Sequence, residues 1–507
     1  MRLGRQWSWT SIRRAATVPV FILFPPIGAS LCQTPQPAPD MQEQVRRLTD
    51  AINRVQGQID EAQRELGDLK TQLTALQPSA AGSSRPVAEE QRTSPDAAEL
   101  SAAVAAIREN ESIHDTQIAT LEQIKVESES KYPLKLSGLI LMTGFVNTRR
   151  VDLAQSPTIA LAGPGSTAST LRQTILGIDA HGPHLFGASS RADLRLDFDA
   201  GTSGGVYSGD NASGIVRMRT AHAELAWDRT KAFFSLDRPI LNPDAPTSLT
   251  AVATPALAWS GNLWTWNPQL GVSRDLMQGS AATVRVEGGL IDVGDSPSLY
   301  STAQSGTYSP PSTAEQSRWP GLEARIAFVN EVRDRELHLG VSGLFAPHRV
   351  PQLKNFNSWA GAIDVGLPIS RFTQLTGSAY RGQALGGLGG GAYKDYVART
   401  YQGEWYFRAL DDSGGWVQWK QRAGERIEFN EAFGIDNIPA HQLRPFVSSY
   451  APSYYNLARN RTITANAIYS PSAYLLFSLE YRRIASSYVG YPTQFSDIIG
   501  LAAGYKF

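Results

Sequence analysis

From residue 132 to the carboxy terminus, apolar and polar residues alternate with a period of two, in short segments that turn residues separate. Successive side chains of a strand point to opposite faces of a sheet, so this pattern predicts strands with one apolar and one polar face. The alternation is clearest across Ser189–Asp199 and recurs in residues 283–290, 322–328 and 475–482. In the first of these segments, Ala192, Leu194, Leu196 and Phe198 lie on one side, and Arg191, Asp193, Arg195, Asp197 and Asp199 lie on the other.

The chain ends on such a strand, because Ile499–Phe507 places an apolar row on one face and an aromatic residue at the terminus. A transmembrane barrel needs a lipid-facing strand here, which closes its sheet and leaves no edge. A soluble sandwich would alternate similarly, with the apolar side inward and shorter spacing between strands. We therefore expect residues 132–507 to form an all-β transmembrane barrel in which Ile499–Phe507 pairs with Leu136–Phe145, with the sandwich as the alternative.

Strand-like segments number about seventeen, whereas single-chain bacterial outer-membrane barrels have an even number of strands. Short periplasmic turns and long outer loops should alternate along the chain. Assigning turns and loops alternately from the two ends of the barrel sequence gives the same result only if Tyr396–Arg408 belongs to one outer loop, Arg381–Gly415. The glycine-rich run Gly386–Gly391 in this loop suits a flexible segment. We therefore predict about 16 antiparallel strands, with 18 as the alternative. The expected short turns lie near residues 181–187, 227–230, 275–279, 330–335, 368–371, 422–425 and 470–473.

The amino-terminal residues 1–30 contain arginines, then an apolar run and then small residues, which is the order of a cleaved export signal. A short membrane anchor is the alternative, but Pro19, Pro25 and Pro26 interrupt the apolar run. A Pro-rich spacer, residues 31–40, follows.

Residues 41–77 carry apolar residues at spacings that alternate between four and three, which predicts a left-handed coiled coil. Its core positions mix β-branched residues with Leu, so two and three strands both remain open. Residues 78–95 are rich in Ser, Ala, Gly and Pro and should form a flexible linker, and 96–131 should form a second helix with heptad spacing. We thus expect an α-helical coiled-coil stalk before the barrel, through which the chain self-associates.

Composition narrows the class of protein only a little further. The 47 basic and 47 acidic residues cancel, so charge gives no reason to expect a nucleic-acid partner. No apolar run of about 20 residues follows the amino terminus, which argues against spanning helices. The single cysteine, Cys32, rules out an internal disulfide, and whether it is modified stays open.

The same strand count makes residues 238–266 the third outer loop, and several features set it apart. It contains four prolines, few charges and a tryptophan cluster. A barrel of this size would enclose a wide hole unless a loop folded inward. We expect this loop to constrict the lumen, and packing on a neighbouring subunit is the alternative. The candidate constriction residues are Asp237, Arg238, Asp244, Trp259 and Trp264.

The strand phase also predicts a set of arginines that point into the lumen. Guanidinium groups stay charged and bind carboxylate or phosphate in a bidentate manner, so free arginines could guide small anions through the pore. Interleaved acids could instead pair with them and leave a nearly neutral wall, and both interpretations stay open. These candidate solute-binding residues are Arg191, Arg195, Arg217, Arg219, Arg285 and Arg325.

Catalytic and metal-binding patterns are weak in this sequence. His181 and His184 fall in an expected turn without helical spacing or a nearby cysteine, which argues against zinc. The run Gly386–Gly391 lacks the Lys-Ser/Thr of a phosphate-binding loop. A barrel hydrolase would need at least two of the remaining barrel histidines to converge with an acid or a serine. The histidines in question are His222, His338, His348 and His441. We expect no enzyme, no catalytic residues, no cofactor and no metal.

The order of export signal, coiled-coil stalk, barrel and terminal Phe507 resembles the DcaP-like trimeric porins of Gram-negative outer membranes. The stretches YRGQALGGLGGGAYKDY and GGWVQWKQRAGERIEFNEAFGIDN are similar to late strands and loops of that family. The resemblance implies an outer-membrane homotrimer, with its stalk in the periplasm, for passive uptake of small and often anionic solutes.

We therefore expect an outer-membrane porin for small hydrophilic solutes. Its expected partners are itself, as a trimer or dimer, together with outer-membrane lipid, lipopolysaccharide and peptidoglycan. One alternative is a structural anchor or cell-wall tether with a plugged barrel, and another is a barrel-type hydrolase.

Overall fold

The computed structural model describes residues 133–200, 214–278, 282–296, 311–332, 335–350, 354–447 and 452–507. These residues belong to one compact unit, Val104–Phe507. Within them, no helix is long and apolar enough to span a membrane. The predictions for the signal peptide, spacer, coiled coil, linker and second helix, which cover residues 1–131, fall outside the described residues.

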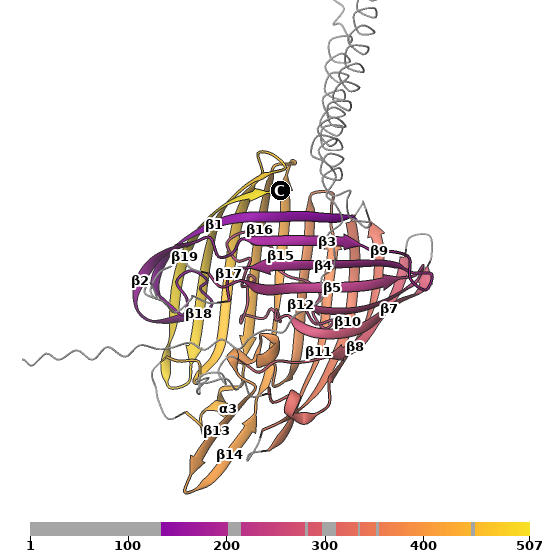
Figure 1. The fold of residues 1–507 in the computed structure, drawn as a ribbon. Coiled ribbons are helices and arrows are strands. Elements are labelled where there is room, and N and C mark those ends of the chain that lie inside the picture. The colour runs from indigo at the N-terminus through magenta and orange to yellow at the C-terminus, as the bar shows by residue number, and fades with distance from the viewer. Residues whose placement is uncertain are drawn as a thin grey trace, which may run out of the picture. The chain divides into compact units, whose positions relative to one another are not determined.

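A single antiparallel sheet forms most of the described chain (Figure 1). Its strands are β1 Leu134–Val151, β2 Ala160–Thr170, β3 Ile175–His181, β4 Ser189–Asp197, β5 Arg217–Ala226, β6 Thr230–Asp237, β7 Asn267–Gln278, β8 Ala282–Ile291, β9 Gly321–Val332, β10 Arg335–Arg349, β11 Asn355–Pro368, β12 Thr373–Gln383, β15 Asp411–Ala423, β16 Ile427–Asn437, β17 Leu457–Tyr469, β18 Leu475–Tyr488 and β19 Tyr491–Lys506. A separate hairpin consists of β13 Tyr396–Tyr401 and β14 Glu404–Ala409, and the helical turns are α3 Ala440–Leu443, η3 Glu315–Ser317, η4 Gly386–Leu388 and η5 Gly391–Tyr393.

The sheet closes because its last strand pairs with its first. The register of β1 and β19 runs from Leu139 opposite Lys506 to Asn147 opposite Ile498. Beyond it, the N–H of Gly138 donates to the carbonyl of Phe507 at 2.9 Å, and the N–H of Phe507 donates back at 3.0 Å. The predicted pairing of the terminal segment with the first strand is therefore confirmed, and closure removes the exposed edge.

The sheet has seventeen strands but only sixteen positions around the barrel. This difference arises because β2 and β3 follow one another along the same edge of β1, separated by residues 171–174. Farther along, β12 pairs directly with β15, whereas β13 and β14 pair only with each other. The prediction of 16 strands, with Tyr396–Arg408 in a loop, is thus confirmed.

Apolar side chains cover the outside of the barrel, and polar ones point inward. On β19, Leu501 is 58% exposed while its neighbour Ala502 is 6% exposed. On β9, Leu322 is 56% exposed while Glu323 is 4% exposed. This orientation is the opposite of a soluble sandwich, so that alternative is wrong; the pattern suits lipid outside and water inside.

One end of the barrel has short turns, including residues 227–229, 369–372, 424–426 and 470–474, near the predicted positions. We call it the short-turn end, and the opposite end, with connections 384–410 and 438–456, the long-loop end. The glycine run in 384–410 was expected to be flexible, but it is buried. This close packing requires glycine, since a Cβ on Gly387 would be 2.0 Å from the Gly294 carbonyl oxygen.

Candidate channel lumen

Residues 238–266, which connect β6 to β7, lie inside the barrel, and we call them the inner loop. Their backbone is bound by inward-facing side chains of the wall. The N–H of Thr247 donates to Gln418 Oε1 at 3.1 Å, and Asn466 Nδ2 donates to the carbonyl of Thr247 at 3.0 Å. Further wall side chains that hydrogen-bond the inner loop are Gln173, Glu323, Ser342, Asn460, Glu480 and Arg482.

Glycines allow the inner loop to approach the wall closely. A Cβ on Gly434 of β16 would be 2.1 Å from the Ser260 carbonyl oxygen. A Cβ on Gly261, which has a φ of +95°, would be 2.1 Å from the Gly415 carbonyl oxygen. Only glycine fits such contacts and favours this backbone angle, so these residues set the depth of the loop.

The predicted tryptophans join the inner loop to connection 384–410. Trp259 stacks on Tyr393, with ring centroids 3.8 Å apart, and it meets Trp264 edge-on at 5.8 Å. Trp259 is only 4% exposed, so most of its ring lies within this packing, and with Trp264 and Tyr393 it borders a pocket of about 290 Å³. Trp264 in turn contacts Trp266 edge-on at 5.5 Å.

The predicted arginines each lie within 4.0 Å of a carboxylate. The N–O distances are 3.3 Å for Arg191–Glu224, 2.6 Å for Arg195–Asp179, 2.7 Å for Arg217–Asp197, 3.7 Å for Arg219–Asp197, 3.0 Å for Arg285–Asp275 and 2.6 Å for Arg325–Glu287. Positive and negative groups therefore alternate along this wall, which weakens its net field.

Two arginines of β5 share Asp197. Arg217 lies directly opposite Asp197 in the register of β4 and β5, and Arg219, two residues along, points to the same face because strand side chains alternate. Arg217 and Arg219 both point to Asp197 and lie over the ring of Trp266, at 5.2 and 4.8 Å. The cations thereby gain cation–π contacts in addition to their shared carboxylate.

Part of the inner wall remains open to water at the short-turn end, where β4 and β6 begin. The inward-facing side chains of Arg191 on β4 and Lys231 on β6 are 50% and 52% exposed. Arg195, farther along β4, is 29% exposed. Such exposure on the inner face indicates a hollow that charged side chains line.

The charged residues of the inner loop hold its first turn in place. The N–H of Arg238 donates to Asp237 Oδ1 at 2.7 Å, and Arg238 Nη1 donates to the carbonyl of Asp244 at 2.5 Å. The carboxylate of Asp244 then meets His338 of β10, whose Nε2 lies 2.7 Å from Oδ2. Asp244 thus connects the inner loop to the wall.

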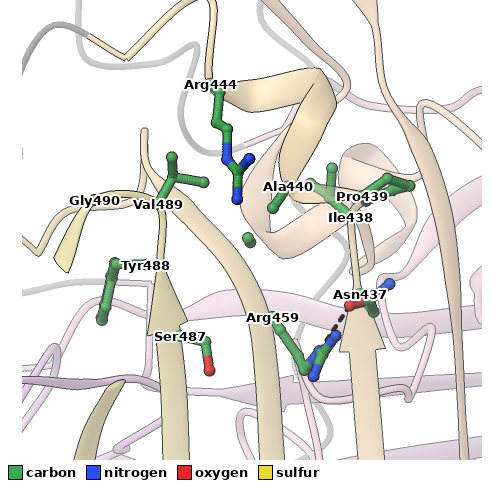
Figure 2. Close-up of a pocket in the computed structure, with 11 residues that line it drawn as sticks. Asn437, Ile438, Pro439, Ala440, Arg444, Arg459, Ser487, Tyr488, Val489 and Gly490 are labelled. Carbon is green, nitrogen blue, oxygen red and sulfur yellow. Dashed lines mark hydrogen bonds between the residues drawn. The ribbon is translucent and has the colours of Figure 1, made fainter. Parts of the chain in front are cut away.

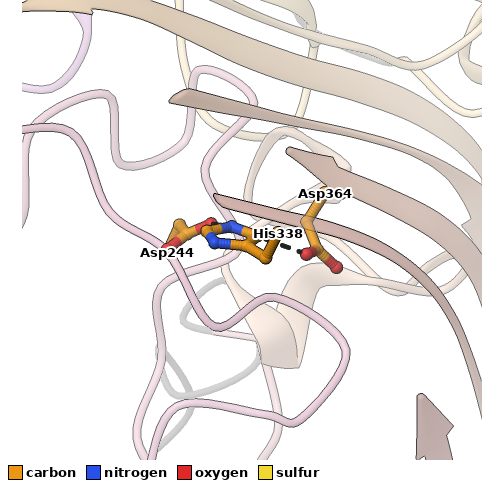
Figure 3. Close-up of side chains that lie close together, drawn as sticks. All are labelled: Asp244, His338 and Asp364. Carbon is orange, nitrogen blue, oxygen red and sulfur yellow. Dashed lines mark hydrogen bonds and ion pairs between the residues drawn. The ribbon is translucent and has the colours of Figure 1, made fainter. Parts of the chain in front are cut away.

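His338 lies at the centre of a compact polar cluster (Figure 3). Its Nε2 is 3.8 Å from Asp364 Oδ2 on β11, and its Nδ1 is 3.5 Å from Glu336 Oε1. Arg325 holds Asp364 by two hydrogen bonds of 3.0 and 2.7 Å. Sequence reasoning missed this cluster: the alternation places the β10 and β11 residues inward, but no local pattern pairs them with Asp244.

The other histidines make separate contacts. His222 contacts Glu224 at 3.3 Å, His348 contacts Thr313 at 2.9 Å, and His441 is exposed in α3. Among the described residues, no two of the four barrel histidines share a hydrogen-bond or ion-pair partner. The one group of potential metal ligands found in the described ranges does not contain His181 or His184. In the described residues, the structure therefore does not bring two of these histidines to one acid or serine, as a barrel hydrolase would need.

A pocket of about 330 Å³ lies at the long-loop end (Figure 2). Arg444 and Arg459 both line it, and Arg459 Nε donates to Asn437 Oδ1 at 2.7 Å. The neighbour of Arg459 along β17, Asn460, points inward to the inner loop, so Arg459 points outward. We therefore place this pocket on the outer surface and not in the lumen.

No protein-family model and no curated protein sequence matches this chain. Among solved structures, the outer membrane channel DcaP of Acinetobacter baumannii matches with a TM-score of 0.52 and 14% identity, over 75% of this chain and 99% of that chain. An anion-selective porin from Comamonas acidovorans has a TM-score of 0.43 and 9% identity, over 74% of this chain and 100% of that chain. OprB of Pseudomonas putida has a TM-score of 0.45 and 9% identity, over 74% of this chain and 94% of that chain.

The likeness to DcaP concerns the barrel fold. At 14% identity it says nothing about which solute this chain would accept. At the level of the barrel fold, the resemblance expected from the sequence is confirmed.

Proposed function

We propose that this chain is a porin of a Gram-negative outer membrane, through which small hydrophilic solutes diffuse passively. One observation supports this most strongly: the barrel keeps charged, water-exposed side chains such as Arg191 and Lys231 on its inner face at the short-turn end. The outside carries the apolar belt that lipid requires. A closed barrel with a wet interior is suited to conduct solutes.

The inner loop would set the width of this channel. It is bound to the wall along much of its length, so it narrows the lumen without depending on a partner chain. Planar-bilayer recording of the folded full-length chain tests the proposal, with stable unitary conductance as the expected result. Correctly folded protein that forms no channels would overturn it and would favour a structural anchor with a plugged barrel.

Charge selectivity is a finer part of the proposal. Each predicted arginine lies near a carboxylate, so we propose at most a weak preference for anions. The reversal potential in a salt gradient measures this directly. A strong anion or cation selectivity would contradict the balance of charge inferred for the wall.

Assembly forms the last part of the proposal. The heptads of residues 41–77 support self-association through a periplasmic stalk and leave two and three subunits open. The resemblance to DcaP-like trimeric porins favours a homotrimer, and we include contacts to outer-membrane lipid, lipopolysaccharide and peptidoglycan in the proposal. Native mass spectrometry of the full chain counts the subunits. Replacing the core positions Ile52 and Ile59 by Asp should reduce the trimer to monomers, whereas replacing Asn53 and Arg64 by Asp, on the outer face of the predicted helix, should not. Retention of the trimer in the first variant would contradict stalk-driven assembly.

A further inference from the structure

Three potential metal ligands from three separate parts of the fold converge in the lumen. They are Asp244 of the inner loop, His338 of β10 and Asp364 of β11, and their ligand atoms all lie within 4.8 Å of one another. His338 Nε2 is 2.7 Å from Asp244 Oδ2 and 3.8 Å from Asp364 Oδ2. Tetrahedral zinc with bonds near 2.1 Å would separate its ligands by about 3.4 Å. The His338–Asp244 separation would therefore lengthen by about 0.7 Å, and the wider separations, which reach at most 4.8 Å, would shorten by at most about 1.4 Å.

The fold leaves room for these side chains by placing glycines opposite them. A Cβ on Gly366 would be 2.3 Å from His338 Cε1, so the ring lies directly over that glycine. A Cβ on Gly340 would be 2.4 Å from Asp364 Oδ1. These two contacts fix the positions of the ligand side chains before any ion binds.

Groups around the three ligands orient them as in metal sites. Glu336 Oε1 lies 3.5 Å from His338 Nδ1, on the side of the ring away from Asp244. A carboxylate in that place attracts a proton to Nδ1, and Nε2, which contacts Asp244 Oδ2 in this structure, would then exchange that contact for the metal. Arg325 donates two hydrogen bonds to Asp364 and thereby fixes its carboxylate. Asp364 has lone pairs beyond those that Arg325 uses.

The charge of the cluster favours a cation. Acidic groups are in excess: Asp244, Asp364 and Glu336 surround His338, and Arg325 is bonded to Asp364 and to a fourth carboxylate, Glu287. Two further cations lie nearby, each beside an additional carboxylate: Arg238, which donates to the Asp244 carbonyl, lies next to Asp237, and Arg285 is bonded to Asp275. A divalent ion would offset this excess, and a proton on His338 is the weaker alternative.

We propose that Asp244, His338 and Asp364 bind a divalent transition-metal ion, Zn²⁺ first among them, which joins the inner loop to the barrel wall. An imidazole with two carboxylates suits zinc, whereas calcium and magnesium prefer oxygen ligands alone. Three protein ligands leave a fourth position for water. Asp244 and Glu336 are 26% and 58% exposed, so water in the lumen reaches the cluster.

Equilibrium binding of Zn²⁺ tests the proposal with the folded full-length chain. After treatment with a chelator and dialysis against Zn²⁺, bound metal is measured by isothermal titration and by elemental analysis. We expect His338→Ala and Asp244→Asn each to lose one zinc per chain, with affinity at this site falling at least about tenfold. His222→Ala is the matched control, because it removes a lumen histidine outside the cluster, and it should keep the wild-type stoichiometry.

A second pair of variants separates the geometry from the ligands. Gly366→Ala should displace the His338 ring and weaken zinc binding, although every ligand remains. Gly361→Ala on the same strand meets nothing within 4 Å and should bind zinc normally. Circular dichroism and gel mobility with and without heating confirm that each variant is folded.

Two results would overturn the proposal. One is a folded wild-type chain that binds no zinc, which would leave a proton as the ion in the cluster. The other is unchanged zinc binding in both His338→Ala and Asp244→Asn. Because the readout is equilibrium binding, its failure says nothing about conductance, and a chain without channel activity could still bind zinc.

Discussion

Gly261 of the inner loop lies so close to Gly415 of β15 that a Cβ at position 261 would be 2.1 Å from the Gly415 carbonyl oxygen. The same residue has a φ of +95°, a conformation that side chains other than glycine rarely adopt. The seating of the inner loop on the barrel wall therefore depends on the absence of a side chain at this point.

Gly261→Ala should lift the inner loop from the wall and destabilise the barrel. Backbone strain alone costs about 1–2 kcal/mol, and the steric clash adds to it. We expect a lower unfolding midpoint and a larger, noisier unitary conductance. Gly294→Ala is the matched control, since a Cβ there meets nothing within 4 Å. Equal behaviour of the two variants would show that close approach does not hold the loop.

Leu501→Arg should destabilise the barrel in lipid vesicles. Leu501 is 58% exposed on the outer face of β19, where a charged side chain near the bilayer midplane costs about 2–4 kcal/mol. Tyr505→Arg, on the same face near the end of the strand, should cost only about 0–1 kcal/mol. Chemical unfolding in vesicles measures both values. A negligible cost at position 501 would argue against lipid at this face.

Asp197→Asn should shift the channel toward anions. Asp197 is fully buried and accepts hydrogen bonds from Arg217 Nε and Nη2 at 2.7 and 2.9 Å, with Arg219 at 3.7 Å. The substitution leaves positive charge without its carboxylate and lowers stability by roughly 1–3 kcal/mol. Asp228→Asn in an exposed turn is the control. An unchanged reversal potential would place Asp197 outside the path of ions.

Asp395→Asn should change how stability depends on pH. Burial raises the pKa of Asp395, in connection 384–410, from 3.8 to about 7, although the N–H groups of Gly387 and Ser296 donate to its carboxylate. The folded carboxyl thus keeps a proton that the unfolded chain releases, and stability falls as pH rises from about 4 to about 7.

Asn resembles the protonated acid and does not titrate. The difference in melting temperature, Asp395→Asn minus wild type, should therefore be larger at about pH 8 than at about pH 4. The exposed Asp228→Asn variant should track the wild type at both values. A constant difference between Asp395→Asn and wild type across this range would contradict a raised pKa.

Much of the barrel follows from local alternation. The inward position of Arg325 and the outward position of Leu322 could be deduced because strand side chains alternate strictly along a regular strand. Parity between short turns and long loops also placed Tyr396–Arg408 outside the sheet. The split of one barrel position into β2 and β3 escaped this reasoning, because the break at residues 171–174 depends on contacts across the lumen, such as Gln173 to Thr250.

By itself, the sequence determined the strand count, the two faces of each strand and the closing partner of the carboxy-terminal strand, since these depend on periodicity and connectivity. The tertiary structure alone decided which carboxylate pairs with each arginine and how the buried glycine run packs. It also decided that Asp244 meets His338 and Asp364, residues far apart in the chain. Such contacts depend on how an irregular loop packs inside a closed sheet, and no local period encodes that packing.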